Sequence, residues 1–128
     1  MFTWVYVAPR KSDLSKTWIA KLAGRTVVLA VQSEVEIRSG PRLANWGTAR
    51  SEALLAQLTG KVTIPVDASV QEKYIDLTVW SKGATHPIHQ KIHTADRWIA
   101  ATALAYDLDL ASGDGIFLNV DGLRVLTV

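Results

Sequence analysis

The segment Thr26–Val31 (TVVLAV) limits the possible folds most, because it is a continuous apolar run of strand length. A strand that is apolar at every position suits a sheet covered on both faces, as in parallel sheets. Four other segments have the composition or length of strands: Thr3–Val7, Val62–Val66, Leu108–Ala111 and Leu123–Val128. Helical patterns lie between these segments, and this alternation predicts an α/β fold with a mostly parallel central sheet and helices on both faces.

Local signals predict where the elements begin and end. Ser33 and Glu36 form an S-x-x-E capping box, so a helix is expected to begin there and to meet Gly40-Pro41. Pro65 predicts that its strand is short or lies at a sheet edge. Further helical patterns cover Leu14–Leu22, Arg42–Leu58, a segment capped by Asp67 and the alanine-rich segment that begins at His93 or Thr94.

The composition excludes several classes of protein. The chain has no cysteine, which excludes a disulfide framework, a cysteine zinc site and a thiol nucleophile. Its 48% of hydrophobic residues and net charge of +2 are unlike those of a disordered chain, and this charge is too weak to indicate nucleic-acid binding by itself. Its 128 residues fit one domain, residues 1–128.

The hydropathy pattern gives no sign of a membrane or a targeting segment. No apolar run reaches the roughly 18–20 residues that span a bilayer. The apolar first residues are not preceded by a basic stretch, as a signal peptide would be. We therefore expect a soluble cytoplasmic protein.

Three acidic residues lie just after predicted strands or at predicted helix starts. They are Glu36, Asp96 and Asp114. In a parallel sheet all three can face the edge formed by the carboxyl ends of the strands, where such folds bind ligands. Clustered carboxylates repel one another unless a cation joins them, and Mg²⁺ prefers oxygen ligands. Each acid also has an ordinary structural role, in a capping box, at a helix N-terminus or in a glycine-flanked turn.

Other polar residues give weaker signals. His89 and His93 have the i, i+4 spacing of a helical metal pair, but the glutamate of H-E-x-x-H is missing and Pro87 breaks the local helix. His93 is a candidate for RNA contact or helix capping. Five basic residues flank the proposed acidic centre and are candidates for holding phosphates, although a solvated charged face is the simpler interpretation: Arg42, Arg50, Lys82, Lys91 and Arg97.

Two segments resemble a known family. Residues 90 to 126, QKIHTADRWIAATALAYDLDLASGDGIFLNVDGLRVL, resemble the C-terminal half of PIN-domain ribonucleases, and are most similar to VapC toxins of bacterial type II toxin–antitoxin pairs. Residues 27 to 40, VVLAVQSEVEIRSG, resemble the second strand and the glutamate-bearing helix of that family. The resemblance implies a PIN-like three-layer α/β/α fold.

The resemblance also implies a function and a set of site residues. Glu36, Asp96 and Asp114 would be the catalytic, metal-binding carboxylates of an Mg²⁺-dependent endoribonuclease, and Mn²⁺ would be accepted too. The metal would activate a water for attack on an RNA phosphodiester, and nearby basic groups would hold the substrate. A cognate VapB-like antitoxin is the expected partner, and a homodimer is a further expectation from similar proteins.

One departure from the family pattern concerns the first strand. The family opens with a hydrophobic strand that ends in Asp-Thr or Asp-Ser, whereas no acid precedes Asp13 here. Aligned backward from Trp18, Met1–Val7 falls at the start of a helix, so the strand and its aspartate would be missing. Either the start is an internal methionine, or the product is short and inactive, a PIN remnant that binds antitoxin or RNA without cleaving. The composition of Thr3–Val7 instead predicts a substitute strand.

Overall fold

The computed structural model describes residues 3–6, 26–49, 52 and 62–127. The strands are β1 (Thr3–Tyr6), β2 (Thr26–Ala30), β3 (Val62–Ile64), β4 (Asp109–Ala111) and β5 (Val125–Leu126). The helices are α2 (Val31–Leu43), α4 (Ala68–Gly83) and α5 (Thr94–Ala105), with 3-10 turns η1 (Pro87–His89), η2 (Lys91–His93) and η3 (Gly115–Phe117). The helix expected at Leu14–Leu22 and most of the pattern at Arg42–Leu58 lie outside these residues.

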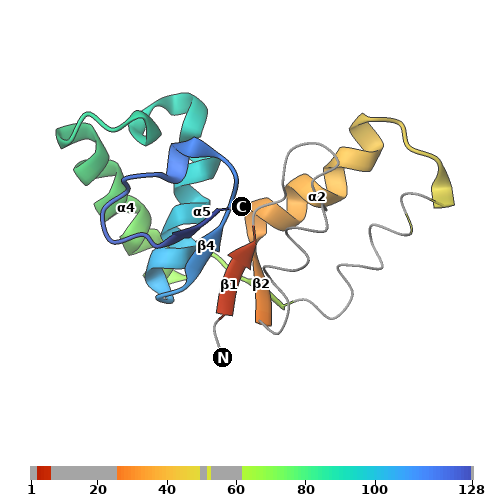
Figure 1. Ribbon diagram of the computed structural model, residues 1–128, viewed down its shortest axis with the longest axis horizontal. Coiled ribbons are helices and arrows are strands. Elements are labelled where there is room, and N and C mark those ends of the chain that lie inside the picture. Colours follow the sequence, from red (N-terminus) through yellow and green to blue (C-terminus); the bar gives the residue numbers. More distant parts are fainter. Residues whose placement is uncertain (1–2, 7–25, 50–51, 53–61, 128) are drawn as a thin grey trace.

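The five described strands form one parallel sheet in the order β3-β2-β1-β4-β5 (Figure 1). The expected α/β fold with a parallel central sheet is therefore confirmed. β3 lies at an edge, as Pro65 predicted. The first strand is not missing: β1 fills the centre of the sheet, with Tyr6 beside Leu29 on one side and Ala111 on the other.

The conformation of Thr3–Tyr6 decides between the two readings of the N-terminal segment. The backward alignment, which placed a helix start there, is wrong, and the strand predicted from composition is confirmed. Aromatic and β-branched residues suit a pleated strand between two neighbours, and the central place in the sheet supplies both neighbours. The local composition was therefore the better guide.

The start of α2 differs from the predicted capping box. The helix begins directly after β2, with Ala30 as its N-cap and no side-chain cap hydrogen bond. Because strand and helix follow each other without a loop, Ser33 falls inside the first turn, where its side chain is fully buried and its hydroxyl has no hydrogen-bond partner among the described residues. The helix also continues through Gly40-Pro41 to Leu43, beyond the expected break.

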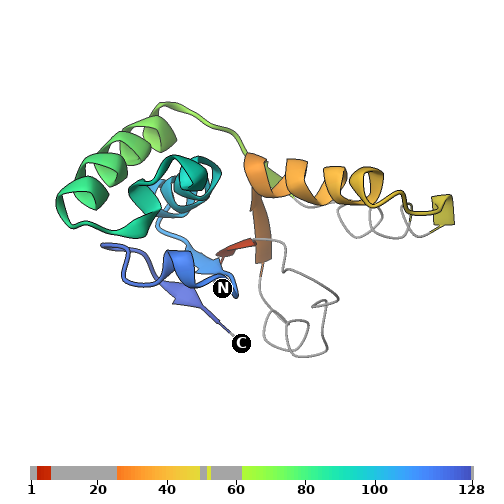
Figure 2. The same cartoon turned by 90° about the horizontal axis from the view of Figure 1, so that it is seen from above.

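The hydrophobic core lies between the sheet and the two helices α4 and α5. These helices pack against each other on one side of the strands (Figure 2). Alanines of α5 allow the helix to approach the sheet closely, and Ile99, Leu110 and Phe117 are among the largest fully buried side chains. The core therefore fixes α5 and the segment after β4 relative to each other.

Asp67 caps α4 as predicted, and its carboxylate has a second partner. The Tyr106 hydroxyl and the Val70 amide donate to it, and these hydrogen bonds lower the pKa of Asp67 below its ordinary value of 3.8. A carboxylate whose pKa is lowered by folding stabilises the protein above its ordinary pKa, and this stabilisation is lost as the pH falls through the lowered pKa.

We expect Asp67→Asn to unfold at a slightly lower urea concentration than the wild type at pH 7. The two midpoints should converge below about pH 4, and a constant difference would contradict this.

Candidate active site at the carboxyl ends of the strands

The order of the strands creates a switch point between β1 and β4. From β1 the chain winds through β2 to β3 on one side, whereas β4 and β5 lie on the other side. In open parallel sheets, ligands bind outside the carboxyl ends of the strands at such a point. The segment after β4 and the start of α2 lie at this edge because they directly follow the carboxyl ends of β4 and β2. The last turn of α5 leads into the start of β4, so the first turn of α5 lies at the same edge.

Asp114 comes from the turn that follows β4. Its Oδ1 accepts a hydrogen bond from the amide of Ile116 at 3.0 Å, which starts η3, and its own amide donates to Oγ of Ser112 at 3.0 Å. Ser112 and Phe117, on either side, are buried. The turn is thus anchored in the core at both ends, and this anchoring sets the position of the carboxylate.

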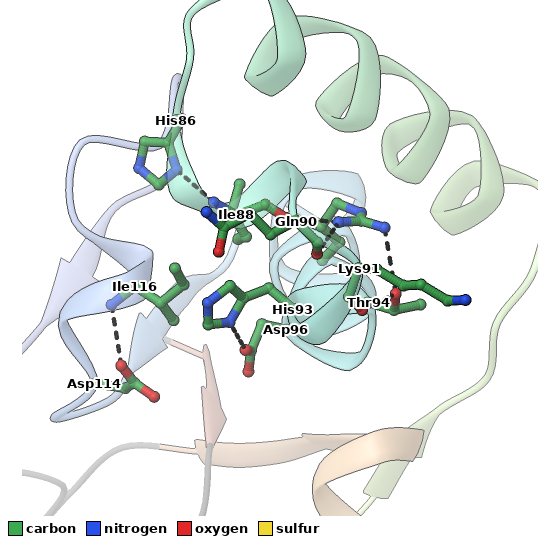
Figure 3. Close-up of polar contacts among 10 residues, drawn as sticks. His86, Ile88, Gln90, Lys91, His93, Thr94, Asp96, Asp114 and Ile116 are labelled. Carbon is green, nitrogen blue, oxygen red and sulfur yellow. Dashed lines mark hydrogen bonds and ion pairs between the residues drawn. The ribbon is translucent and has the colours of Figure 1, made fainter.

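Asp96 lies in the first turn of α5, as the sequence predicted. Its Oδ2 lies 2.8 Å from Nδ1 of His93, the N-cap residue of the helix. The two side chains are 25% and 26% exposed, so both are accessible from solvent. Figure 3 shows the carboxylates of Asp96 and Asp114 directed toward the same side, where β1 and α2 lie.

Glu36 lies in the second turn of α2 and its side chain is exposed. Within the described residues, no group of three or more His, Asp or Glu side chains is close enough to hold a metal ion. The two aspartates nevertheless suit a hard divalent cation, since Mg²⁺ in proteins is commonly held by one or two carboxylates together with waters. Asp96 and Asp114 would hold such an ion.

The predicted basic residues do not form one patch. Arg42 and Lys82 lie in the last turns of α2 and α4, which occupy opposite ends of the described structure in Figures 1 and 2. Lys91 is exposed in η2, beside the N-terminus of α5. Arg50 lies outside the described residues. Of Arg42, Lys82 and Lys91, Lys91 is the nearest in sequence to Asp96.

Arg97 has a structural position rather than a surface one. It is 6% exposed, and its Nη1 donates to the carbonyls of Ile88 at 2.6 Å and Gln90 at 2.9 Å. Its Nη2 donates to the hydroxyl of Tyr74 at 3.1 Å. We therefore leave Arg97 out of the residues proposed to contact RNA. Sequence reasoning missed this role because backbone carbonyl partners leave no signal in the sequence.

The three histidines also have partners inside the protein. In His86, Nδ1 accepts from the amide of Ile88 at 3.1 Å, and Nε2 donates to the carbonyl of Leu118 at 2.8 Å. The ring of His89 donates to the carbonyl of His86. His93 is the N-cap residue of α5, and its ring bonds the side chain of Asp96 rather than a backbone amide. These contacts explain the histidines without a histidine metal site.

A family model for the PIN domain matches residues 3–123, nearly the whole chain. The chain therefore belongs to the PIN-domain family, whose members are generally nucleases and thus hydrolases. This membership agrees with the sheet order and with acids at the carboxyl ends of the strands.

Several solved structures share the fold. They include VapBC-1 from nontypeable Haemophilus influenzae (TM-score 0.79, 14% identity, 98% of each chain covered) and VapBC2 from Rickettsia felis bound to a DNA fragment from their promoter (0.76, 17%, 98% of each chain). VapBC-5 from Mycobacterium tuberculosis has a TM-score of 0.69 at 23% identity, over 98% of this chain and 97% of that one. A comparison with curated proteins gave no significant match.

No helix in the described part of the chain combines the length and the apolar character that crossing a bilayer requires.

Proposed function

We propose that this chain is a VapC-like toxin that hydrolyses RNA phosphodiester bonds with the help of Mg²⁺ and is neutralised by a cognate VapB-like antitoxin. The observation that carries the proposal is the common direction of Asp96 and Asp114 at the carboxyl edge of a PIN fold. Two carboxylates that face one side of a sheet edge leave a negative site that a cation would neutralise. The proposal therefore assigns these two residues as the main metal ligands.

The bound metal would supply an activated water and would stabilise charge on the phosphoryl oxygens. Asp96 and Asp114 would hold the ion, and Glu36 of α2 is proposed as a third ligand. Mn²⁺ would substitute for Mg²⁺, because all-oxygen sites accept both ions.

RNA would approach along the edge of the sheet that carries the two aspartates. Lys91, which is exposed in η2, would contact phosphates to one side of the aspartates, because Figure 3 shows its side chain directed away from Asp96 and Asp114. Arg42, Lys82 and Arg50 would contribute at more distant parts of a longer RNA. Such contacts position the backbone and carry no sequence information by themselves.

The proposed partner follows from proteins with the same fold. VapBC-5 is described as a member of the VapBC family of toxin–antitoxin systems, and VapBC2 from Rickettsia felis is bound to a DNA fragment from their promoter. We propose a similar antitoxin for this chain, with the pair acting at its own promoter. Homodimer formation and a cytoplasmic location stay predictions.

The test is cleavage of a structured RNA by the purified chain. We expect cleavage with Mg²⁺ or Mn²⁺, none with EDTA, and strong loss in Asp96→Asn and Glu36→Gln. Lys73→Gln, a change at an exposed residue in the middle of α4, is the matched control and should leave cleavage unchanged. Cleavage that persists in EDTA would contradict the role of the metal, and full activity of Asp96→Asn would contradict the proposed site.

A second candidate function is favoured by one specific observation. β1 ends at Tyr6, and the next residues are Val7 and Ala8, so the strand is not followed by the acid that the family pattern places there. A PIN protein with this change could bind antitoxin or RNA without cleaving. Tight antitoxin binding by a chain that shows no cleavage with either metal would favour this function.

A further inference from the structure

The segment from His86 to His93 connects α4 to α5, and Figure 3 shows its contact with Asp96. At one end, His93 bonds the carboxylate of Asp96. At the other end, His86 bonds the carbonyl of Leu118, in the turn that begins at Asp114. The segment therefore ties together the two parts of the chain that carry the aspartates.

The backbone of this segment is held rigidly by Arg97. The guanidinium donates to the carbonyls of Ile88 and Gln90, and the side chain of Ile88 is fully buried. Hydrogen bonds from a buried charged donor are shorter and stronger than neutral ones. His93 is thus presented from a fixed backbone rather than from a free loop.

Helix capping does not account for the position of the His93 ring. An N-cap side chain normally accepts a hydrogen bond from a backbone amide of the first turn, but His93 makes no such cap bond. Its ring bonds the side chain of Asp96 instead. Since an ionised carboxylate can only accept, Nδ1 of His93 carries the proton and donates to Oδ2.

We propose that His93 is a positioning residue: its Nδ1–H fixes Oδ2 of Asp96 so that Oδ1 faces the side shared with Asp114. This inference rests on the proposed function, because the fixed oxygen is the one assigned to the metal. Removing a hydrogen bond to a residue that binds a metal typically lowers metal affinity or activity by about 10–100-fold.

The test is Mn²⁺ binding to the metal-free, full-length chain by titration calorimetry, together with RNA cleavage. We expect His93→Ala to weaken Mn²⁺ binding and cleavage by about 10–100-fold. His93→Asn should retain Mn²⁺ affinity and cleavage within about threefold, since the asparagine amide can donate near the position of Nδ1.

Ile92→Ala is the matched control, because the neighbouring Ile92 is 82% exposed. His93→Gln, whose amide is displaced by one methylene, should also lose affinity, and it replaces His93→Ala if that variant does not fold.

The outcomes separate this inference from the proposed function. If the wild type binds Mn²⁺ and His93→Ala binds it equally well, the positioning role is overturned and the proposed function stands. If His93→Asn loses as much affinity as His93→Ala, the hydrogen bond is not what matters, and the inference is again overturned. If the wild type itself neither binds Mn²⁺ nor cleaves RNA, the proposed function fails and the inference fails with it.

Discussion

Asp114→Asn is expected to lower metal-dependent RNA cleavage by about two to three orders of magnitude, because several kcal/mol of charge stabilisation by the metal would be lost. The substitution removes the charge but preserves the fold. Oδ1 of Asp114 accepts the hydrogen bond from Ile116 that starts η3, and the carbonyl oxygen of asparagine accepts the same bond. The cleavage rate and the melting temperature, measured on the same preparations, should therefore separate, with only the rate falling.

Asp121→Asn is the matched control for this experiment. Asp121 is an exposed acid that lies beyond η3 in the turn before β5, so its loss changes the net charge equally. We expect its cleavage rate to stay within about twofold of the wild type, since exposed charges are screened. Equal losses in the two variants would indicate a general charge effect on RNA binding. Full activity of Asp114→Asn would remove Asp114 from the site.

Much of the fold could be predicted from the sequence because its signals are local. The apolar run of β2, the cap at Asp67 and the alanine-rich helix α5 each reflect preferences of neighbouring residues. The prediction failed where packing overrides such preferences. Ser33 has the sequence context of a capping box, but it is buried within a helix that begins directly at the end of a strand.

The site could be predicted only in outline. The places of Asp96 and Asp114 followed from the position of each acid after a strand or at a helix start. The role of Arg97 could not be predicted, because its partners are backbone carbonyls and a distant tyrosine hydroxyl. A basic residue next to a proposed ligand resembles a phosphate contact until its burial is known.

The segment that holds His93 depends on a single buried cation. If Arg97 is replaced by methionine, the carbonyl of Ile88 loses its donor while the volume of the side chain is nearly kept. The carbonyl of Gln90 loses one of two donors, since it also accepts from the amide of His93 at 2.9 Å. A hydrogen bond to a charged group contributes about 1.5–3 kcal/mol, and a buried polar group left unpaired costs about 1–3 kcal/mol. The backbone of residues 86–93 should therefore loosen before the rest of the core is affected.

We expect Arg97→Met to lower the free energy of unfolding by about 3–5 kcal/mol, as measured by urea denaturation. Arg97→Lys keeps the charge but loses the second nitrogen, Nη2, which donates to the hydroxyl of Tyr74, so its stability should lie between those of the methionine variant and the wild type. Amide exchange should become faster first at residues 86–93.

The control is Arg38→Met on α2. The exposed guanidinium of Arg38 lies 3.9 Å from the Glu34 carboxylate, and this ion pair should contribute less than about 1 kcal/mol to stability. Equal stabilities of Arg97→Met and the wild type would contradict a stabilising role for these hydrogen bonds, because no other described side chain donates to both carbonyls.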